Sequence, residues 1–370
     1  MAAKNWYELD NPEEIVSPSL LVYPDRIEKN IELMISMIGD PSRLRPHIKT
    51  HKTAEIIEMQ MQHGIQKFKC ATIAEAELLA QCGTKDILLA MQPVGANLNR
   101  FFKLIASYPN SVFSTIVDNE ITIGLISKMA ASNNLTVALF LDLNTGMNRT
   151  GIEPNDHAVE LFKQIAEDPN LEARGLHAYD GHIRDTDLKL RKQVCDAAYK
   201  LVTNLKSKIE AIGIEVKTLV MGGSPSFPIH AARQNVETSP GTTLLWDERY
   251  GTSFKDMPFL PAAVLLTRIV SKPKSGVICL DLGHKAIAPE MDFPRVKIFG
   301  LEDAEQTGQS EEHLVLHYTK SETLKIGDVF YAIPMHICPT VAKYSKVLTV
   351  EDHQITGAWK IAARDHQMQI

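Results

Sequence analysis

Short apolar, β-rich runs alternate with longer amphipathic segments through the first two thirds of this chain. Such an alternation is the signature of a parallel sheet whose strands are joined by helices. The apolar runs that follow this pattern lie at residues 43–48, 67–72, 86–91, 112–117, 136–141, 173–178, 216–221 and 236–245. Connecting segments with the apolar spacing of helices lie at residues 25–38, 73–81 and 186–212.

Eight strand-helix units in about 230 residues match the usual span of a (β/α)8 barrel, and a doubly wound open sheet is the competing arrangement. After about residue 250 the apolar runs become short and are separated by turn residues, with no helical pattern between them. We therefore predict an α/β fold, a TIM-type barrel over residues 19–249 followed by a smaller all-β domain over residues 250–370. Residues 1–18 are expected to pack on the β domain.

Composition excludes several classes of partner. The formal net charge of -6 and the pI near 6.1 give no broad basic face, which argues against nucleic acid. No apolar run reaches the roughly 18 residues of a membrane span, and the N-terminal residues lack the apolar core of a signal peptide. The cysteines number 5, are widely scattered and suit a reducing compartment. We expect a cytoplasmic protein that contacts neither membranes nor nucleic acid.

The segment LRPHIKTHK, residues 44–52, combines Lys49 and Lys52 with His47 and His51 at the end of the first apolar run. Taken alone, a basic segment of this kind is typical of a solvated loop. A lysine that acts as a nucleophile needs a lowered ammonium pKa, and partial burial beside other cationic or hydrogen-bonding groups provides it. The reaction that this arrangement suggests is formation of a Schiff base.

Barrel enzymes place their chemistry at the carboxyl ends of the strands, so the residues there are the candidates. Beyond Lys49, the predicted strand ends carry Asp142, Asn144, Arg149, Tyr179, Asp180, His182, Arg184, Asp185, Gly222, Gly223, Ser224, Gly241 and Thr242. The glycines of the last two strand ends allow close backbone approach, and barrels frequently bind phosphate in the loops after strands seven and eight. A lysine at the first strand and a phosphate site at the last two predict pyridoxal phosphate across the barrel mouth.

The motifs RPHIKTHK, GMNRTG, AYDGH, MGGSPS and SPGTT occur in this order and are followed by MHICPT in the β-rich part. Together they resemble the D-threonine aldolase and D-serine dehydratase group of the alanine racemase-like, fold type III pyridoxal-phosphate enzymes. The resemblance runs from about residue 17 to about residue 364. It implies the same two-domain architecture, which in that group is usually a homodimer.

The resemblance also implies roles for single residues. Lys49, and not Lys52, would carry the cofactor, with Arg149 beside its ring and Tyr179 facing it. The phosphate would lie against Gly222, Gly223, Ser224, Gly241 and Thr242. His47 is then a candidate for cofactor binding and His51 for catalysis. Aldolases of the group can carry a histidine a few residues after the tyrosine. This chain departs from them there, and His182 is the catalytic candidate in its place, the alternative being a hydrogen bond within its own loop.

His336 and Cys338 form the second distinguishing feature. Residues i and i+2 of an extended segment point to the same side, so this imidazole and thiolate could share one ion. A lone His-x-Cys is more often coincidental packing, but in the resembled group this position is a metal site, with His-x-Asp common in aldolases and His-x-Cys familiar in dehydratases. A thiolate ligand favours zinc over manganese.

The resemblance therefore predicts a metal- and pyridoxal-phosphate-dependent lyase whose substrate is a small D-β-hydroxy amino acid. A D-threonine aldolase, which forms glycine and acetaldehyde, is favoured by the overall similarity. A D-serine dehydratase, which forms pyruvate and ammonia, is favoured by Cys338. A racemase has no use for a metal, and non-catalytic carriers of the superfamily are usually the barrel alone, so these two alternatives rank lower.

Overall fold

A computed structural model describes residues 4–370, which fall into two compact units. The barrel unit consists of residues 34–49, 57–241 and 365–370. The β unit consists of residues 4–33, 50–56 and 242–364. The chain thus passes between the units several times, while the contiguous boundary between residues 249 and 250 stays a prediction.

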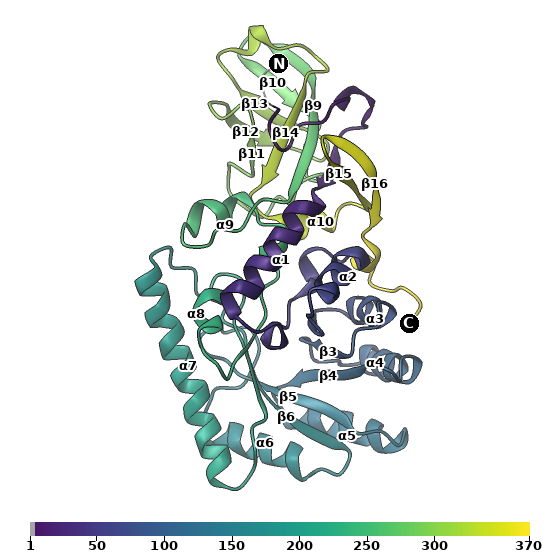
Figure 1. The fold of residues 1–370 in the computed structure, drawn as a ribbon, viewed down its shortest axis with the longest axis vertical. Helices are drawn as coiled ribbons and strands as arrows, with labels where there is room; N and C mark the ends of the chain where they lie inside the picture. Colours follow the sequence, from purple (N-terminus) through teal and green to yellow (C-terminus); the bar gives the residue numbers. More distant parts are fainter. Residues whose placement is uncertain (1–3) are drawn as a thin grey trace. The chain divides into compact units, whose positions relative to one another are not determined.

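Seven parallel strands form the sheet of the barrel unit, in the order β2-β3-β4-β5-β6-β7-β8. Figure 1 shows β3, β4, β5 and β6 following one another across this sheet. Their bounds are Lys67–Cys70, Asp86–Leu89, Val112–Val117, Val137–Asp142, Leu171–Ala178, Thr218–Met221 and Glu237–Thr238. The first predicted strand, at residues 43–48, is not a strand. It still takes the eighth place, because Leu44 bridges to Thr238 of β8 and His47 bridges to Lys69 of β2. Pro46 has no N–H to donate, which limits a regular ladder at this point.

Helices α1 and α2 lie partly in each unit, at Pro24–Ile38 and Ala54–Gln62, and the barrel unit holds α3 to α8. These run over Ile73–Gln81, Ala96–Ser107, Glu120–Ser132, Asp156–Glu167, Leu188–Ala211 and Phe227–Ala231. Several begin at a residue whose side-chain oxygen accepts a hydrogen bond from a backbone N–H of the first turn, as at Thr72, Asn119, Asn155 and Asp187. Helix α3 packs on β2 and β3, and α6 packs on β5 and β6. The predicted alternation of strands and helices is confirmed.

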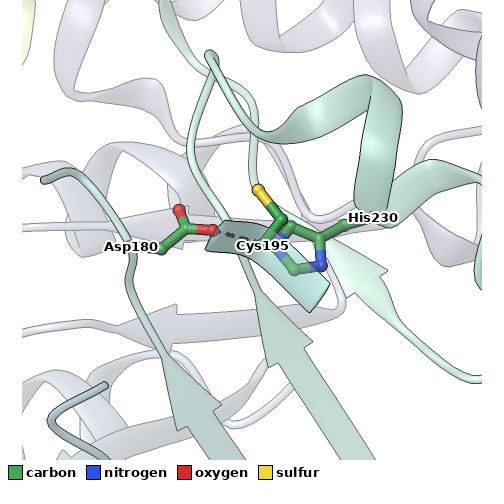
Figure 2. Close-up of side chains that lie close together, drawn as sticks. All are labelled: Asp180, Cys195 and His230. Atoms are coloured by element: carbon green, nitrogen blue, oxygen red, sulfur yellow. Dashed lines mark hydrogen bonds and ion pairs between the residues drawn. The ribbon is translucent and has the colours of Figure 1, made fainter. Parts of the chain in front are cut away.

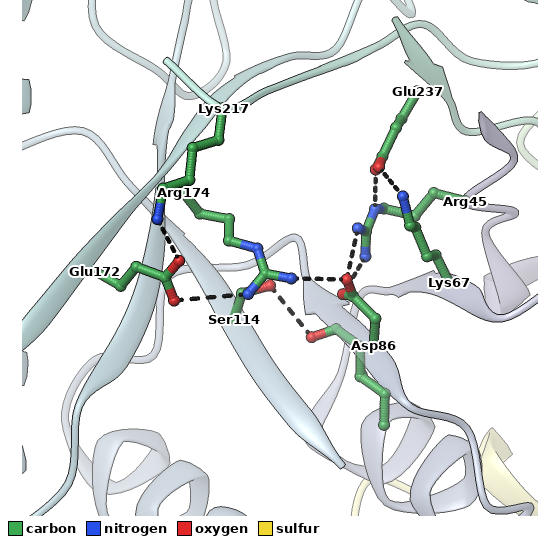
Figure 3. A network of polar contacts seen from close by, with 9 residues as sticks. Arg45, Lys67, Asp86, Ser114, Glu172, Arg174, Lys217 and Glu237 are labelled. Atoms are coloured by element: carbon green, nitrogen blue, oxygen red, sulfur yellow. Dashed lines mark hydrogen bonds and ion pairs between the residues drawn. The ribbon is translucent and has the colours of Figure 1, made fainter. Parts of the chain in front are cut away.

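A buried network of charges closes the amino ends of the barrel strands (Figure 3). Arg45 is 1% exposed and holds two carboxylates, those of Asp86 at 2.6 and 3.1 Å and of Glu237 at 2.8 Å. Arg174 also binds Asp86, at 3.0 Å, and Lys67 also binds Glu237. Every buried charge of the network therefore has a partner of opposite sign, as buried ions require.

The β unit is built on a sheet in the order β12-β13-β10-β9-β1-β15-β16, in which β14 pairs with both β9 and β11. The bounds of β1 and of β9 to β16 are Ser19–Val22, Ala263–Lys274, Val277–Leu280, Val296–Ile298, Glu305–Gln309, Leu314–His317, Val329–Pro334, Lys346–Glu351 and Gln354–Lys360. Trp6 and Tyr7 pack against a core cluster that includes Leu21 and Tyr331.

Two short helices, α9 at Glu248–Ser253 and α10 at Ile337–Val341, accompany this sheet. The expectation of no helices after about residue 250 is therefore wrong at α10, where five residues are too few for the periodicity of a helix to be read. In residues 4–370, no helix is both long enough and apolar enough to cross a bilayer.

Candidate active site

A cavity of about 540 Å³ opens in the barrel unit, and its lining includes His47, Lys49, Lys69, Arg149, His177 and Tyr179. These side chains come from the carboxyl-terminal parts of the strands or from the residues that follow them, where a barrel keeps its chemistry. Four predicted residues, Lys49, His47, Arg149 and Tyr179, are thus brought together. The lining leaves out Lys52, His51 and His182.

Three cationic groups surround the ring of Tyr179. The Nζ atoms of Lys49 and Lys69 lie 5.4 and 5.7 Å from the ring centroid, and the Arg149 guanidinium carbon lies 5.1 Å from it. A ring face attracts cations at such distances. The cavity is therefore suited to an anionic or carbonyl-bearing ligand that meets amines, a guanidinium and an aromatic ring together.

Glycines on both sides fix the position of the Tyr179 ring. A methyl group on Gly181 would lie 2.4 Å from the Cε1, Cζ and Oη atoms of the tyrosine. A methyl group on Gly223 would lie 3.0 Å from Cε2, on the opposite edge of the ring. Only residues without a Cβ leave room for the ring where it stands. The glycines of AYDGH and MGGSPS therefore position the tyrosine.

Lys49 lies in a 3₁₀ turn, Ile48–Thr50, directly after the bridged segment that completes the barrel. Its backbone N–H donates to Nδ1 of His47 at 3.2 Å, which holds that imidazole at the cavity wall. The turn ends the extended segment and presents the Lys49 side chain to the cavity. Lys49 was predicted to end a strand, whereas the structure places it in a turn after a segment that makes only isolated bridges to β2 and β8.

The glycine amides expected to bind phosphate already donate within the chain. The amide of Gly222 donates to the carbonyl of Ala178, and the amide of Gly223 donates to Asp180 and to the Ser226 hydroxyl. The amide of Gly241 donates to the hydroxyl of Ser224 at 3.1 Å. A phosphate that used these amides would have to replace these partners.

Hydroxyl groups beside this loop offer other donors. The side-chain oxygens of Thr238 and Ser239 are buried and have no hydrogen-bond partner among residues 4–370. Such orphaned donors at the end of the last barrel strand suit a phosphate, since buried polar groups are otherwise paired. Sequence reasoning passed over both, although they begin the run TSPGTT. Thr242, the other predicted phosphate residue, lies in the β unit, and its hydroxyl is 3.5 Å from the Cys338 sulfur.

Asp180, Cys195 and His230 form a buried cluster whose ligand-type atoms lie within 4.8 Å of one another (Figure 2). One Asp180 oxygen lies 2.8 Å from Nε2 of His230, and the other accepts from the Ser226 hydroxyl at 2.7 Å. Burial raises the pKa of the Cys195 thiol to about 12, so the sulfur is not a thiolate. We therefore interpret the cluster as a support for the MGGSPS loop rather than as a metal centre.

His336 and Cys338 do lie close together in the β unit, but in a local backbone structure that differs from the predicted one. They are not on an extended segment, because His336 is the N-cap of α10 and Cys338 is the second residue of that helix. Burial alone would lower the pKa of His336, yet the hydrogen bond and charge of Cys338, with Glu290, raise it to about 9.

The surroundings of Cys338 favour its thiolate form. Burial opposes ionisation, but His336 and the hydroxyls of Thr50 and Thr242 outweigh it and lower the pKa of the thiol. The Thr50 oxygen lies 3.1 Å from the sulfur. Nδ1 of His336 lies 2.5 Å from Glu290 Oε1, so the hydrogen bond with Cys338 is left to Nε2. Once the protons on the sulfur and on Nε2 are lost, Cys338 and His336 form a donor pair that a divalent metal can use.

His51 and His182 are placed elsewhere. His51 is 1% exposed, its Nδ1 accepts from the backbone N–H of Thr53, and burial lowers its pKa to about 3. His182 packs against Gly146, and its Nδ1 is buried with no hydrogen-bond partner among the described residues. Their catalytic roles stay predictions.

Two residues that sequence reasoning did not select, Lys69 and His177, line the cavity instead. A lysine in the middle of a predicted strand was the available signal for Lys69, since lysine is almost never fully buried unless paired.

Comparison with known proteins places the chain in a family. Residues 22–248 match the model of the alanine racemase N-terminal domain, and residues 262–350 match a putative serine dehydratase domain. The 3-hydroxy-D-aspartate aldolase of Paracoccus denitrificans (strain Pd 1222) is 27% identical over 95% of this chain and 92% of its own length. The D-threonine aldolase of Arthrobacter sp is 26% identical over 94% and 92%.

Among solved structures, D-threonine aldolase from Filomicrobium marinum superposes with a TM-score of 0.87 at 26% identity, over 95% of this chain and 96% of that one. The resemblance predicted from the motifs and the predicted fold class are both confirmed. This chain belongs to the alanine racemase N-terminal domain family, with a putative serine dehydratase domain after the barrel.

Proposed function

We propose that the chain is a pyridoxal-phosphate-dependent lyase that acts on D-β-hydroxy amino acids and cleaves them as a D-threonine aldolase does, to glycine and an aldehyde. The observation that carries the proposal is the cavity in which Lys49, Lys69 and Arg149 surround Tyr179. The similar aldolases support the reaction class, since each is named for cleavage of a D-configured β-hydroxy amino acid.

The residues of the cavity fit pyridoxal phosphate. Lys49 lines the cavity and supplies an amine for the aldehyde. The hydroxyls of Thr238 and Ser239, at the end of β8 and outside the cavity lining, are unpaired within residues 4–370 and can donate to the phosphate. Arg149 and Tyr179 supply a guanidinium and a ring beside the heterocycle. When bound, the cofactor provides an electron sink for the electron pair at the substrate Cα. The chain's own part is to hold the substrate, exclude water and move protons.

We propose His336 and Cys338 as the ligands of a divalent metal. The thiolate favours zinc, and manganese is the second choice. A divalent ion held there would supply Lewis acidity toward a β-hydroxyl, which is otherwise a weak acid and a poor leaving group. The proposal extends to the remaining expectations: a small D-amino acid as the only ligand besides the cofactors, a homodimer, and a cytoplasmic location.

D-serine dehydratase is the second candidate, supported by the cysteine at position 338 and by the match of residues 262–350 to a putative serine dehydratase domain. Aldol cleavage begins with loss of the β-hydroxyl proton, whereas dehydration begins with loss of the Cα proton. Nearly the same side chains serve both reactions. A racemase and a non-catalytic carrier rank lower, because neither has a use for a metal-binding pair on a second unit.

Product analysis tests the proposal. Purified protein loaded with pyridoxal phosphate and either Zn²⁺ or Mn²⁺ is incubated separately with D-threonine, D-3-hydroxyaspartate, D-serine and their L enantiomers. We expect glycine and the matching aldehyde from the D-β-hydroxy acids, and turnover of the L enantiomers slower by at least about 100-fold, the size of a lost positioning contact. Pyruvate from D-serine as the faster reaction would select the dehydratase. Equal turnover of both enantiomers, or racemisation alone, would contradict the proposal.

A further inference from the structure

Arg149 reaches the active cavity from the loop that follows β5, and backbone contacts close the base of this loop. Its two ends form an isolated parallel bridge between Leu143 and Ile152. The N–H of Ile152 also donates to the carbonyl of Asp142 at 2.9 Å. Residues 144–151 therefore leave the end of β5 and return beside it, and the reach of Arg149 depends on how the returning segment is held.

Gly151 lies two residues after Arg149, where the loop returns. Its φ is +93°, and a Cβ there would lie 2.6 Å from the carbonyl carbon of Leu143 and 2.7 Å from the backbone nitrogen of Asn144. Both facts require glycine at this position. The Gly151 N–H donates to Oδ2 of Asp118 at 2.9 Å, and Asp118 directly follows β4. A carboxylate at the end of the neighbouring strand thus holds the segment that carries Arg149.

The other oxygen of Asp118 is bound as well. Oδ1 accepts from Nε2 of Gln92 at 2.6 Å and from Nδ2 of Asn119 at 2.8 Å. Oε1 of Gln92 in turn accepts from the Asp118 N–H at 3.3 Å and from Nδ2 of Asn119 at 3.1 Å. Gln92 follows β3 and lines the cavity, whereas the cavity lining leaves out Asp118. Asp118 therefore connects the ends of β3, β4 and β5 from outside the cavity lining.

Helix capping does not account for these contacts. The cap of α5 is Asn119, whose Oδ1 accepts from the N–H of Thr122 at 2.9 Å. An ionised carboxylate is an acceptor at both oxygens, and each oxygen of Asp118 faces N–H groups. Hydrogen bonds to an ionised group are roughly twice as strong as those between neutral groups. Asp118 is therefore suited to fixing the backbone of a loop on the next strand.

We propose that Asp118 is a positioning residue of the active site, which holds the Arg149 guanidinium beside the ring of Tyr179 by fixing Gly151. The guanidinium carbon lies 5.1 Å from the centroid of that ring. The inference rests on the proposed function, in which Arg149 stands beside the cofactor ring. Loss of the Asp118 carboxylate releases the returning segment of the loop, and a misplacement of about 1 Å can cost about 100-fold in rate.

The first test observes Arg149 in the cofactor-free protein and so does not depend on activity. Arginine labelled with ¹⁵N is followed by NMR, and the Nε–H signal of Arg149 is identified by its absence in Arg149→Met. Asp118→Ala should move this signal toward the position of exposed arginines, because the guanidinium moves away from the Tyr179 ring. An Arg149 signal that is unaltered in Asp118→Ala would overturn the proposal.

Asn155→Ala is the matched control for this measurement. Asn155 is the side-chain cap of α6 in the same unit and accepts from the N–H of Ala158. Its replacement should destabilise the protein, as loss of a cap does, and should leave the Arg149 signal in place. The control therefore separates a general loss of stability from a displacement of Arg149.

The second test is a double-mutant cycle in the protein loaded with pyridoxal phosphate. For cleavage of D-threonine, kcat/KM is measured in the original protein, Asp118→Ala, Arg149→Met and the double variant. Asp118→Ala should lower kcat/KM by about 100-fold in the original protein. In the Arg149→Met background it should change kcat/KM by less than about 2-fold, because it acts through Arg149. Both single variants should also raise the pH at which the cofactor spectrum changes, because a positive charge has left the cofactor.

An equal loss from Asp118→Ala in the two backgrounds would overturn the proposal, as would an original kcat/KM and cofactor spectrum in Asp118→Ala. If Asp118→Ala does not fold, Asp118→Ser replaces it in both tests, since its shorter side chain falls short of the Gly151 amide. Absence of D-amino acid turnover in the original protein would instead refute the proposed function. The NMR signal would still report whether Asp118 holds Arg149 in place.

Discussion

Replacing Gly181 with alanine should displace the ring of Tyr179 and thereby impair catalysis. The new methyl carbon would lie 2.4 Å from two ring carbons and the phenolic oxygen of Tyr179, whereas ordinary contacts begin at 3.4 Å. The ring must therefore retreat by about 1 Å, the difference between these two distances. Gly223 limits movement on the opposite edge, where a methyl carbon would lie 3.0 Å from the ring. The ring is left to move toward the cavity that holds Lys49 and Lys69.

A misplacement of about 1 Å in a catalytic site costs about 100-fold in rate, and crowding of this kind costs about 1–3 kcal/mol of stability. We expect kcat for cleavage of D-threonine to fall by about 100-fold in Gly181→Ala. The free energy of unfolding, measured in urea, should fall by about 2 kcal/mol. The absorption spectrum of bound pyridoxal phosphate should change as well, because the Tyr179 ring faces Lys49, the proposed attachment point of the cofactor.

Gly124→Ala is the control for this prediction. Gly124 lies within α5 of the same unit, and a methyl group there meets nothing within 4 Å. Alanine in a helix interior should stabilise the protein by about 0.5–1 kcal/mol and leave kcat unchanged. If Gly181→Ala retains the original kcat and cofactor spectrum, the idea that these glycines fix Tyr179 for catalysis is refuted.

Three further predictions concern the buried charge network, His51 and the proposed metal. Arg45→Met should lower the free energy of unfolding in urea by about 3 kcal/mol, the low end for a broken buried ion pair, because both carboxylates keep a second partner; a loss below 1 kcal/mol would contradict this. His51 must charge in the unfolded chain below pH 6.5 but stays neutral in the fold until about pH 3, so stability falls as pH decreases through this window. Between pH 6.5 and pH 5, the free energy of unfolding of His51→Gln should fall by about 2 kcal/mol less than that of the original protein. Urea denaturation at each pH measures this difference. Chelation should abolish cleavage and leave the cofactor spectrum intact, and Cys338→Asp should respond better to Mn²⁺ than to Zn²⁺; full activity without metal would refute the metal proposal.

Helices and strands were predicted with correct bounds where residues at their own ends determine where they begin and end. The strand Val112–Val117 and the helix Ile73–Gln81 have the predicted bounds, the first as an apolar run and the second because Thr72 caps it. The last barrel strand is much shorter than the run at 236–245. Pro240 cannot donate to a ladder, so only Glu237–Thr238 pairs with β7.

Candidate site residues could be predicted where a sequence motif contains them, but not where the fold brings residues from distant strands together. Arg149 and Tyr179 come after strands and Lys49 comes after the bridged segment, and the motifs that contain these residues are visible in the sequence. The contact of Lys69 with His177 depends on which side of two distant strands faces the cavity, and a single sequence does not give that register. The approach of His336 to Cys338 depends on a helix cap that the extended pattern of its surroundings did not suggest.

The central claim is that Lys49 holds the cofactor, and covalent mapping tests it most directly. The protein loaded with pyridoxal phosphate is reduced with borohydride and digested, and mass spectrometry locates the lysine that carries the added mass. We expect the adduct on Lys49, and its loss in Lys49→Ala. An adduct on Lys52 or Lys69, or no adduct on any lysine, would contradict the account.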